Sequence, residues 1–367
     1  KTVLLKSVLS GYEQTVNIDL LLGKAFHRYS AYPGLFVEEM RGELAKSISK
    51  PLIVAIDEIQ KLPLLLDEVH LLIEENKGRI VFLLTGSSAR KLKRGGGNLL
   101  AGRAITCYLH PLSFVECEID LARALTFGTL PGIYLETELE IPTLDSYVVT
   151  YLREEIQQES LVRGIDRFTR FLDYAAQVNG EPVNFSKLGQ QCGVSGKTAA
   201  EYYSILTDTM LAKQLSGWAH SVKKQLLQAP KFYFFDCGVL NALNGELKSD
   251  LKPSSFRYRR LFENYIVQEL HRINDYFELG LRFHYWRDKD GHEVDVIVSR
   301  NVKKPLAAIE IKSHTAPRPE DCPGFSWFSD DYPDVPKWCI CQTERSYDIS
   351  GIKFVPWQDG LLLCKTI

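Results

Sequence analysis

Two short apolar runs that end in polar residues constrain the fold of this chain most strongly. Pro51-Leu-Ile-Val-Ala-Ile-Asp57 leads directly into Glu58, and Arg79-Ile-Val-Phe-Leu-Leu-Thr85 follows a stretch with helical spacing over residues 64–75. Apolar runs of this length are typical of parallel strands that are buried on both faces. The alternation of strand and helix therefore predicts an α/β fold in which helices cover a parallel sheet.

The composition excludes several classes of protein. The chain has 367 residues, of which 45% are hydrophobic and 25% are charged, and its formal net charge is −2. These values exclude a mainly disordered, collagenous or coiled-coil chain, and the balanced charge argues against a generally basic nucleic-acid binder. No apolar run approaches the roughly 20 residues of a membrane span, so we expect no membrane partner. The length predicts two or three domains.

The cysteines predict neither disulfides nor a zinc site. Eight are scattered along the chain; only Cys339 and Cys341 lie close in sequence, and no second pair or nearby His completes a zinc pattern. Reduced thiols in a cytosolic protein are the simplest interpretation. We therefore expect a cytoplasmic location and no structural metal.

Asp57 and Glu58 are the first candidates for chemistry. They follow a buried strand, and the ligands of open α/β sheets gather at the carboxyl ends of the strands. We expect Asp57 to hold Mg²⁺ and Glu58 to polarise the attacking water in phosphoryl transfer. An acidic helix cap that follows a strand is the alternative interpretation.

The start of the chain favours the nucleotide interpretation. Lys1 and Thr2 lead into residues 2–10, whose apolar spacing is that of an amphipathic helix. A phosphate-binding loop ends in Gly-Lys-Ser/Thr and runs into a helix. If glycine-rich residues precede it, Lys1 is expected to reach the β- and γ-phosphates of ATP, and Thr2 to ligate Mg²⁺. Because residue 1 is Lys and not Met, we expect the N-terminus of this domain to be incomplete.

Polar and basic residues follow the second strand. Thr85-Gly-Ser87 are expected to sense the γ-phosphate beside Asp57. Between residues 76 and 115 there are seven Lys or Arg residues and no Asp or Glu. Arg103 or Arg90 is expected to act as a sensor or as an arginine finger towards a neighbouring subunit. A solvated basic loop is the alternative.

The middle of the chain is predicted to be helical. The helical pattern runs from about residue 144 to 178, and residues 184–215 predict a helix-turn-helix in which Ser195 caps the second helix. Gly196-Lys197-Thr198 copies the end of a phosphate-binding loop, but no apolar strand precedes it, so we reject it as a phosphate site. The unit is expected either to contact DNA phosphates or to connect domains. The lysines considered for such contacts are Lys187, Lys197, Lys213, Lys223, Lys224 and Lys231.

The last third predicts a second α/β region. A strand is expected over residues 231–236, a helix over 260–270, and two further strands over 293–298 and 306–312. Asp290-Gly291 supplies the tight reversal of a hairpin. Linkers are expected near residues 112–130 and 245–256.

Segments along nearly the whole chain resemble, in order, the prokaryotic AAA-type ATPases of the AAA_14 group. The resemblance implies an ATP- and Mg²⁺-dependent ATPase. It implies a P-loop AAA-type parallel sheet with helices over residues 1–125, a helical winged-helix domain over 126–250, and an α/β nuclease-like domain over 251–367. The segments that carry it are Ala55–Lys61, Leu84–Ser88, Leu100–Ala104, His110–Phe114, Tyr151–Ile156, Phe232–Gly238, Leu261–Asn264 and Glu293–Asp295.

The C-terminal domain of this family resembles the PD-(D/E)xK nucleases, and the chain has residues that match. The resemblance implies that Asp295 and Glu310 bind Mg²⁺, that Glu263 completes the cluster, and that Lys312 orients water or stabilises charge on the phosphate. Alternation along a strand places Glu310 and Lys312 on the same face. Exposed acid–base pairs on a hairpin are the alternative, and such a domain can also keep its acids while only binding DNA or another partner.

The leading prediction is an Mg²⁺-dependent ATP-binding and ATP-hydrolysing protein that couples its nucleotide state to the nuclease-like domain. DNA is the expected partner. One alternative is a nucleotide-switched signalling or interaction protein that does not cleave DNA, and another is an ATP-licensed DNA endonuclease. A protein partner or a homo-oligomer also agrees with the sequence.

Overall fold

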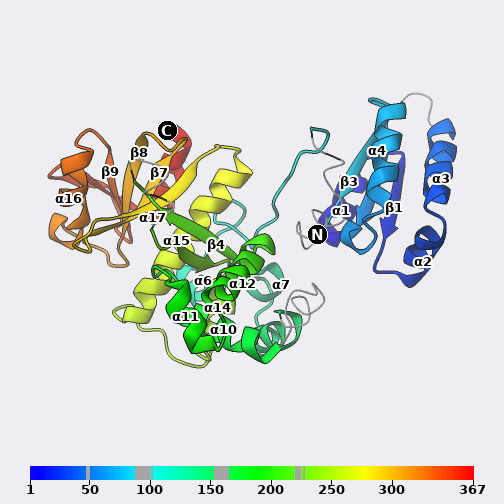
Figure 1. Cartoon of the computed structure of the whole chain (residues 1–367). Coiled ribbons are helices and arrows are strands. Elements are labelled where there is room, and N and C mark those ends of the chain that lie inside the picture. The colour runs from blue at the N-terminus through cyan, green and yellow to red at the C-terminus, as the bar shows by residue number, and fades with distance from the viewer. Residues whose placement is uncertain (47–49, 87–99, 101, 153–164, 220–224, 226–227) are drawn as a thin grey trace. The chain divides into compact units, whose positions relative to one another are not determined.

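The computed structural model describes residues 1–46, 50–86, 100, 102–152, 165–219, 225 and 228–367, with the backbone alone described at 151, 152 and 165. The chain divides into two compact units, Lys1–Leu109 and His110–Ile367. Figure 1 shows both units and labels many of their helices and strands. Within the described residues, no helix has the length and apolar character needed to cross a membrane.

A three-stranded parallel sheet of order β1-β2-β3 forms the centre of the N-terminal unit. Its strands are β1 (Thr15–Asp19), β2 (Leu52–Asp57) and β3 (Ile80–Leu84). Every residue of β2 is buried, as the apolar run predicts. The predicted parallel sheet is thereby confirmed, while β1 is a strand that the sequence pattern did not indicate.

Helices cover both faces of this sheet. Leu5 and Leu9 of α1 pack on Ile53 and Ala55 of β2, whereas Val54 and Ile56 face the core formed with the other helices, because alternate strand residues point to opposite faces. The helices predicted over 2–10 and 64–75 are confirmed. The helices of the unit are α1 (Thr2–Leu9), α2 (Gly23–Ala31), α3 (Pro33–Lys46) and α4 (Leu65–Glu75), with a 3₁₀ turn η1 (Ile59–Lys61).

An eight-stranded mixed sheet of order β10-β11-β9-β8-β7-β6-β4-β5 forms the centre of the C-terminal unit. The antiparallel pairs β6–β7 and β7–β8 confirm the predicted hairpins, and Gly291 lies at the first reversal with φ of +95°. The strands are β4 (Ala212–Gly217), β5 (Lys231–Phe234), β6 (Arg282–Arg287), β7 (Glu293–Ser299), β8 (Pro305–Ile311), β9 (Lys337–Cys341), β10 (Tyr347–Ile349) and β11 (Ile352–Pro356).

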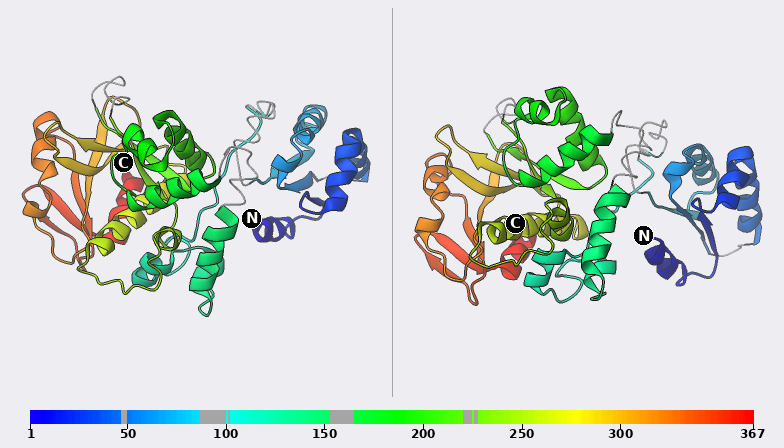
Figure 2. Two further views of the ribbon diagram at one scale, coloured as in Figure 1. Left: turned by 60° about the horizontal axis from the view of Figure 1, so that its bottom comes forward. Right: turned by 90° about the horizontal axis from the view of Figure 1, so that it is seen from below.

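Different helices cover the two faces of the large sheet. The long helix α15 (Phe256–Tyr276) packs on the face that carries Val296 and Ile309, and α17 (Trp357–Leu363) lies beside it (Figure 2). Helix α16 (Gly324–Asp331) packs on the opposite face, against Val294 and Ala308. Other helical segments among the described residues are α6 (Leu121–Phe127), α7 (Pro131–Tyr134), α8 (Glu140–Ser146), η3 (Tyr147–Leu152), α10 (Ile165–Gln177), α14 (Cys237–Leu243), η4 (Pro319–Asp321) and η5 (Cys364–Thr366).

The predicted helix-turn-helix is confirmed as α11 (Phe185–Cys192) and α12 (Gly196–Asp208). The Ser195 hydroxyl accepts a hydrogen bond from the amide of Thr198 at 3.0 Å, which caps α12. Tyr203 of α12 stacks on Phe232 of β5 with ring centroids 3.9 Å apart. The following hairpin, β4–β5, joins the large sheet through the parallel pair β4–β6, so the helix pair packs on an edge of that sheet.

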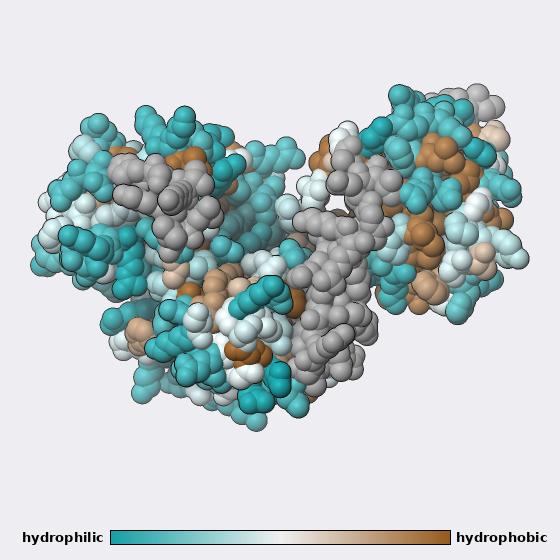
Figure 3. All heavy atoms as spheres, viewed as in Figure 1, coloured by the Kyte–Doolittle hydropathy of each residue, from teal (hydrophilic) through white to brown (hydrophobic). Residues whose placement is uncertain are grey.

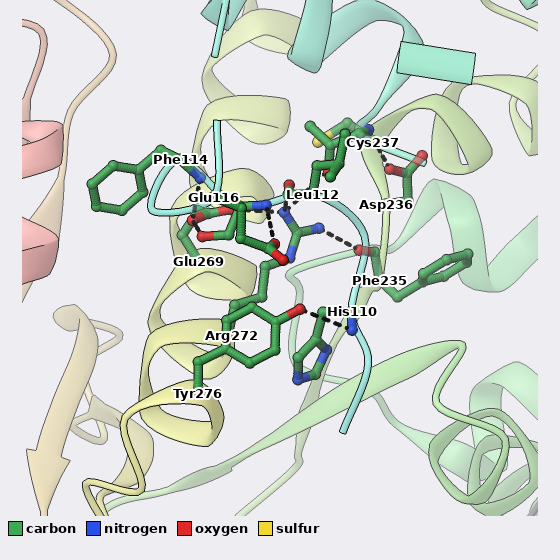
Figure 4. A network of polar contacts seen from close by, with 12 residues as sticks. His110, Leu112, Phe114, Glu116, Phe235, Asp236, Cys237, Glu269, Arg272 and Tyr276 are labelled. Carbon is green, nitrogen blue, oxygen red and sulfur yellow. Dashed lines mark hydrogen bonds and ion pairs between the residues drawn. The ribbon is translucent and has the colours of Figure 1, made fainter. Parts of the chain in front are cut away.

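The prediction of a linker near residues 112–130 is wrong, because this segment is packed into the C-terminal unit. Ser113 is fully buried, and its hydroxyl donates to Glu269 of α15 at 2.5 Å. Arg272 donates to the carbonyl of Leu112 at 2.9 Å, and the amide of His110 donates to the Tyr276 hydroxyl at 3.2 Å (Figure 4). The chain is thus fastened to α15 as soon as the C-terminal unit begins.

Candidate functional site

Three polar side chains converge at one edge of the N-terminal sheet. Asp57 ends β2 and is only 2% exposed. The Thr2 hydroxyl, at the start of α1, donates to one carboxylate oxygen of Asp57 at 2.5 Å, and the Thr85 hydroxyl, just after β3, donates to the other. Packing of α1 on β2 brings Thr2 to this edge, since Leu5 and Leu9 fix the helix on the sheet.

Lys1 and Glu58 lie beside this group. The Lys1 ammonium donates to the carbonyl of Gly86 at 2.8 Å. The amide of Glu58 donates to the Thr85 hydroxyl at 3.2 Å, and the Gln60 amide donates to the Glu58 carboxylate. Glu58 has φ of 58°, a left-handed conformation that costs a non-glycine residue free energy and that recurs at functional sites. The turn therefore holds the Glu58 carboxylate in a defined place next to Asp57.

The other predicted residues of this region have different positions. The Arg103 guanidinium pairs with Glu74 of α4 at 2.6 Å, so the sensor or finger role of Arg103 stays a prediction. Ser87 and Arg90 lie outside the described residues. Lys197 and Thr198 lie in the first turn of α12, with no strand before them, which agrees with their rejection as a phosphate site.

The sequence patterns missed two residues at this edge. Asp19 ends β1 in register with Asp57, and its carboxylate accepts from the amide of Leu21 at 2.8 Å. Gln60 is buried and holds Glu58. A strand signal over residues 15–19 would have pointed to Asp19, because the carboxyl ends of parallel strands meet at one edge. Gln60 lies in the segment Ala55–Lys61 that carries the family resemblance, but no chemical role was predicted for it.

The residues at this edge fit an Mg²⁺ ion. Hydroxyl and carboxylate oxygens are hard ligands of the kind that Mg²⁺ takes, and the ion binds through one or two protein ligands together with phosphate oxygens. Thr2 and Asp57 supply such oxygens, and they already lie within hydrogen-bond distance of each other. These two residues would hold the ion.

A second charged group lies in the C-terminal unit, where β7 and β8 diverge. The Asp295 carboxylate accepts from the amide of Ile311 at 2.7 Å, and Lys312 pairs with Glu310 at 2.7 Å. Glu263 of α15 accepts from the Tyr233 hydroxyl at 2.7 Å. The predicted proximity of Glu310 and Lys312 on one face agrees with their ion pair.

Electrostatic interactions join the predicted members of this group. Burial, reinforced by the negative charge of Asp295, raises the pKa of Glu263 to about 7, and the same two causes raise the pKa of Glu310 well above its usual value. Burial lowers the pKa of Lys312, but the charges of Asp295 and Glu310 outweigh it and raise the pKa overall. Asp295 therefore interacts with all three partners proposed from the sequence.

Lys231 is a member of this group that the sequence patterns place elsewhere. The sequence suggests a surface lysine for DNA phosphates, yet Lys231 is 2% exposed and pairs with Glu293. Burial lowers its pKa, while the charges of Glu263, Glu293 and Asp295 outweigh burial and raise it. The pairing of β4 with β6 brings the β4–β5 hairpin, and Lys231 with it, to the cluster.

This acidic group does not fit a metal ion as it stands. No set of three or more His, Cys, Asp and Glu side chains within the described residues is arranged to hold one. Glu310 is engaged by Lys312, and Asp295 by a backbone amide. The metal role of Glu263, Asp295 and Glu310 therefore stays a prediction.

The lysines around the helix-turn-helix are only partly available for DNA. Lys187 and Lys197 are exposed. Lys213 pairs with Asp275 at 3.5 Å, and Lys231 is buried in the acidic group. Lys223 and Lys224 lie outside the described residues. A phosphate-binding role for the described part of this unit thus depends on Lys187 and Lys197.

Comparison with known proteins divides the chain into three matched regions. Residues 1–118 match the AAA domain family AAA_14, residues 118–251 match a domain of unknown function (DUF8612), and residues 258–359 match another (DUF4143). The predicted domain boundaries near residues 125 and 250 remain predictions.

Two relatives are similar over most of the chain. They are the uncharacterized protein Rv2008c of Mycobacterium tuberculosis and the uncharacterized protein Mb2031c of Mycobacterium bovis, each 25% identical over 252 residues. The aligned region is 67% of this chain and 56% of each relative, so the chain spans little more than half the length of these curated relatives. No solved structure matches. The chain therefore carries an AAA domain at its N-terminus and a DUF4143 domain towards its C-terminus.

Proposed function

We propose that the N-terminal unit binds ATP together with Mg²⁺ and hydrolyses it, and that the nucleotide state alters the C-terminal unit. The observation that carries the proposal is the convergence of the Thr2 and Thr85 hydroxyls on Asp57, with the Lys1 ammonium beside them. A nucleotide-switched interaction protein remains the alternative from another class. A partner protein, a second copy of this chain and DNA are all proposed partners.

The residues of the sheet edge divide the chemistry between them. The Lys1 ammonium binds phosphate oxygens in place of the Gly86 carbonyl that it contacts now. Glu58, oriented by Gln60, accepts a proton from the attacking water. Thr85 holds both Asp57 and the backbone of Glu58, so it fixes the relative position of the two acids. Bound Mg²⁺ neutralises phosphate charge.

Lys1→Ala is expected to weaken ATP binding about 10- to 100-fold, since hydrogen bonds to charged groups contribute about 1.5–3 kcal/mol. Titration of the full chain with a fluorescent ATP analogue and Mg²⁺ measures the effect. Lys6→Ala is the matched control, because Lys6 lies on an exposed turn of the same helix. Equal affinities of Lys1→Ala and the unaltered chain would remove Lys1 from the phosphate site.

We infer a second candidate function, DNA cleavage, for the C-terminal unit. Its support is the electrostatic link from Asp295 to Glu263, Glu310 and Lys312. Cleavage would require the acidic group to rearrange, so no chemical step is assigned to it.

Lys312→Ala is expected to slow plasmid cleavage in Mg²⁺ about 10- to 100-fold, because a charged hydrogen-bond donor next to the phosphate is lost. Agarose gels of supercoiled plasmid measure the rate, with exposed Lys304→Ala as the control. If the unaltered chain leaves plasmid intact at every Mg²⁺ concentration, the interaction protein without DNA cleavage becomes the better hypothesis.

A further inference from the structure

Trp327 of α16 is an exposed tryptophan whose ring stacks on a histidine. It is 48% exposed, whereas the other four tryptophans of the chain are each 7% exposed or less. Its ring stacks on that of His292, with centroids 4.2 Å apart and planes within 17° of parallel. The two rings therefore overlap face to face, and Trp327 remains half exposed to water.

Hydrogen bonds hold the His292 ring of this pair in place. Nδ1 of His292 lies 2.6 Å from one carboxylate oxygen of Asp288, and the other oxygen accepts from the amides of His292 and Asp290, each at 2.9 Å. Gly291, with φ of +95°, closes the turn between them. The ring of His292 is therefore fixed before any partner arrives.

The ring pair lies next to the acidic group. A Cβ atom on Gly324, at the start of α16, would collide with the carbonyl oxygen of Glu293 and lie 2.9 Å from a carboxylate oxygen of Glu310. Trp327 follows Gly324 by three residues, which places it one turn along the same side of the helix. Trp327 therefore lies about one helical turn from Gly324, the residue that adjoins Glu310.

The surroundings suit a charged partner with unpaired bases. Arg287 and Lys289 project from the same turn as His292, and both are exposed. Asp288 is engaged by His292, and Glu293 by Lys231 and, at 4.0 Å, by Arg287, so Asp290 is the remaining exposed acid of this turn. The surface visible around α16 is mainly hydrophilic (Figure 3), which argues against an apolar docking site. Bases of single-stranded nucleic acids stack on exposed aromatic rings while basic side chains follow the backbone.

We propose that the Trp327–His292 ring pair is a stacking platform for an unpaired nucleobase, and that its partner is single-stranded nucleic acid passing Arg287 and Lys289. The proposal places the nucleic acid beside Glu310. The biological role of this binding rests on the second candidate function, DNA cleavage by the C-terminal unit. Binding itself requires no cleavage, so the two can fail separately.

Tryptophan fluorescence of the full chain tests the platform, because Trp327 is the exposed tryptophan. Single-stranded oligonucleotides of DNA and RNA are expected to quench it, and Trp327→Ala is expected to abolish the quenching and weaken binding about tenfold. Trp327→Phe is expected to retain most of the affinity. An oligonucleotide with abasic sites is expected to bind the unaltered chain as weakly as the intact oligonucleotide binds Trp327→Ala. ATP turnover of Trp327→Ala is expected to be unchanged.

Three results would overturn the proposal. One is equal affinity of the unaltered chain and Trp327→Ala for the oligonucleotide, measured by anisotropy of an end label. Another is equal affinity for the intact and the abasic strand. The third is quenching of Trp327 by a basic peptide but by no oligonucleotide, which would assign the platform to a protein partner. Plasmid cleavage is measured apart, so its absence leaves these three comparisons unaffected.

Discussion

Glu58→Gln is expected to lower ATP turnover by about 10²- to 10⁴-fold while ATP affinity stays nearly unchanged, because a positioned general base contributes a factor of this size. Glutamine keeps the size of the side chain and accepts the hydrogen bond from Gln60 through its carbonyl. It cannot take the proton of the attacking water. Release of inorganic phosphate, with binding of a fluorescent ATP analogue measured in parallel, separates the two effects.

A matched comparison comes from Asp57→Asn, which changes the neighbouring acid in the same way. The Asp57 carboxylate accepts hydrogen bonds from the hydroxyls of Thr2 and Thr85. Loss of its charge should therefore weaken binding of ATP in Mg²⁺ as well as turnover. Turnover by Glu58→Gln at the rate of the unaltered chain would show that another group serves as the base. Binding without measurable turnover in the unaltered chain would favour the nucleotide-switched interaction protein.

The elements around the nucleotide site were predictable where the sequence pattern is strong. The strand that ends at Asp57 has six consecutive buried residues, and the helix after Lys1 buries Leu5 and Leu9 against the sheet. Strand β1 escaped prediction because it has five residues, of which only Ile18 is buried. Its acid, Asp19, was missed with it.

The acidic group of the C-terminal unit was predictable only in part. Family resemblance points to Glu263, Asp295, Glu310 and Lys312, and electrostatic interactions join all four. The sequence suggests a surface position for Lys231 because a lysine next to a helix-turn-helix is ordinarily solvated. Its burial depends on the pairing of β4 with β6, a contact between distant segments that no local pattern encodes.

The attachment of residues 110–116 to α15 could not be predicted from the sequence either, because it also depends on contacts between distant segments. Ser113 and Leu112 resemble part of a linker, yet their partners, Glu269 and Arg272, lie more than 150 residues further along the chain. A loop buried in this way must satisfy its polar groups. The partners are two charged residues on one helix that pair at 2.6 Å (Figure 4).

Arg272→Met is expected to destabilise the C-terminal unit by about 3–5 kcal/mol, since removing one partner of a buried ion pair leaves the other charge unpaired. Glu269 is fully buried, and Arg272 is 2% exposed. Methionine also forfeits the hydrogen bonds to the carbonyls of Leu112 and Phe235. All five tryptophans lie beyond residue 110, so urea unfolding followed by tryptophan fluorescence reports on this unit alone.

The double variant Glu269→Gln with Arg272→Met separates charge from packing. It removes both charges, while the carbonyl of the introduced glutamine side chain still accepts from Ser113, so a smaller loss of stability than in Arg272→Met is expected. Arg287→Met is the exposed control, because its pair with Glu293 spans 4.0 Å at the surface and should contribute less than about 1 kcal/mol. Equal destabilisation by Arg272→Met and Arg287→Met would mean that the contacts of Glu269 and Arg272 do not stabilise the attachment of residues 110–116 to α15. A large difference between them would establish that the chain is anchored to α15 at the point where it enters the unit.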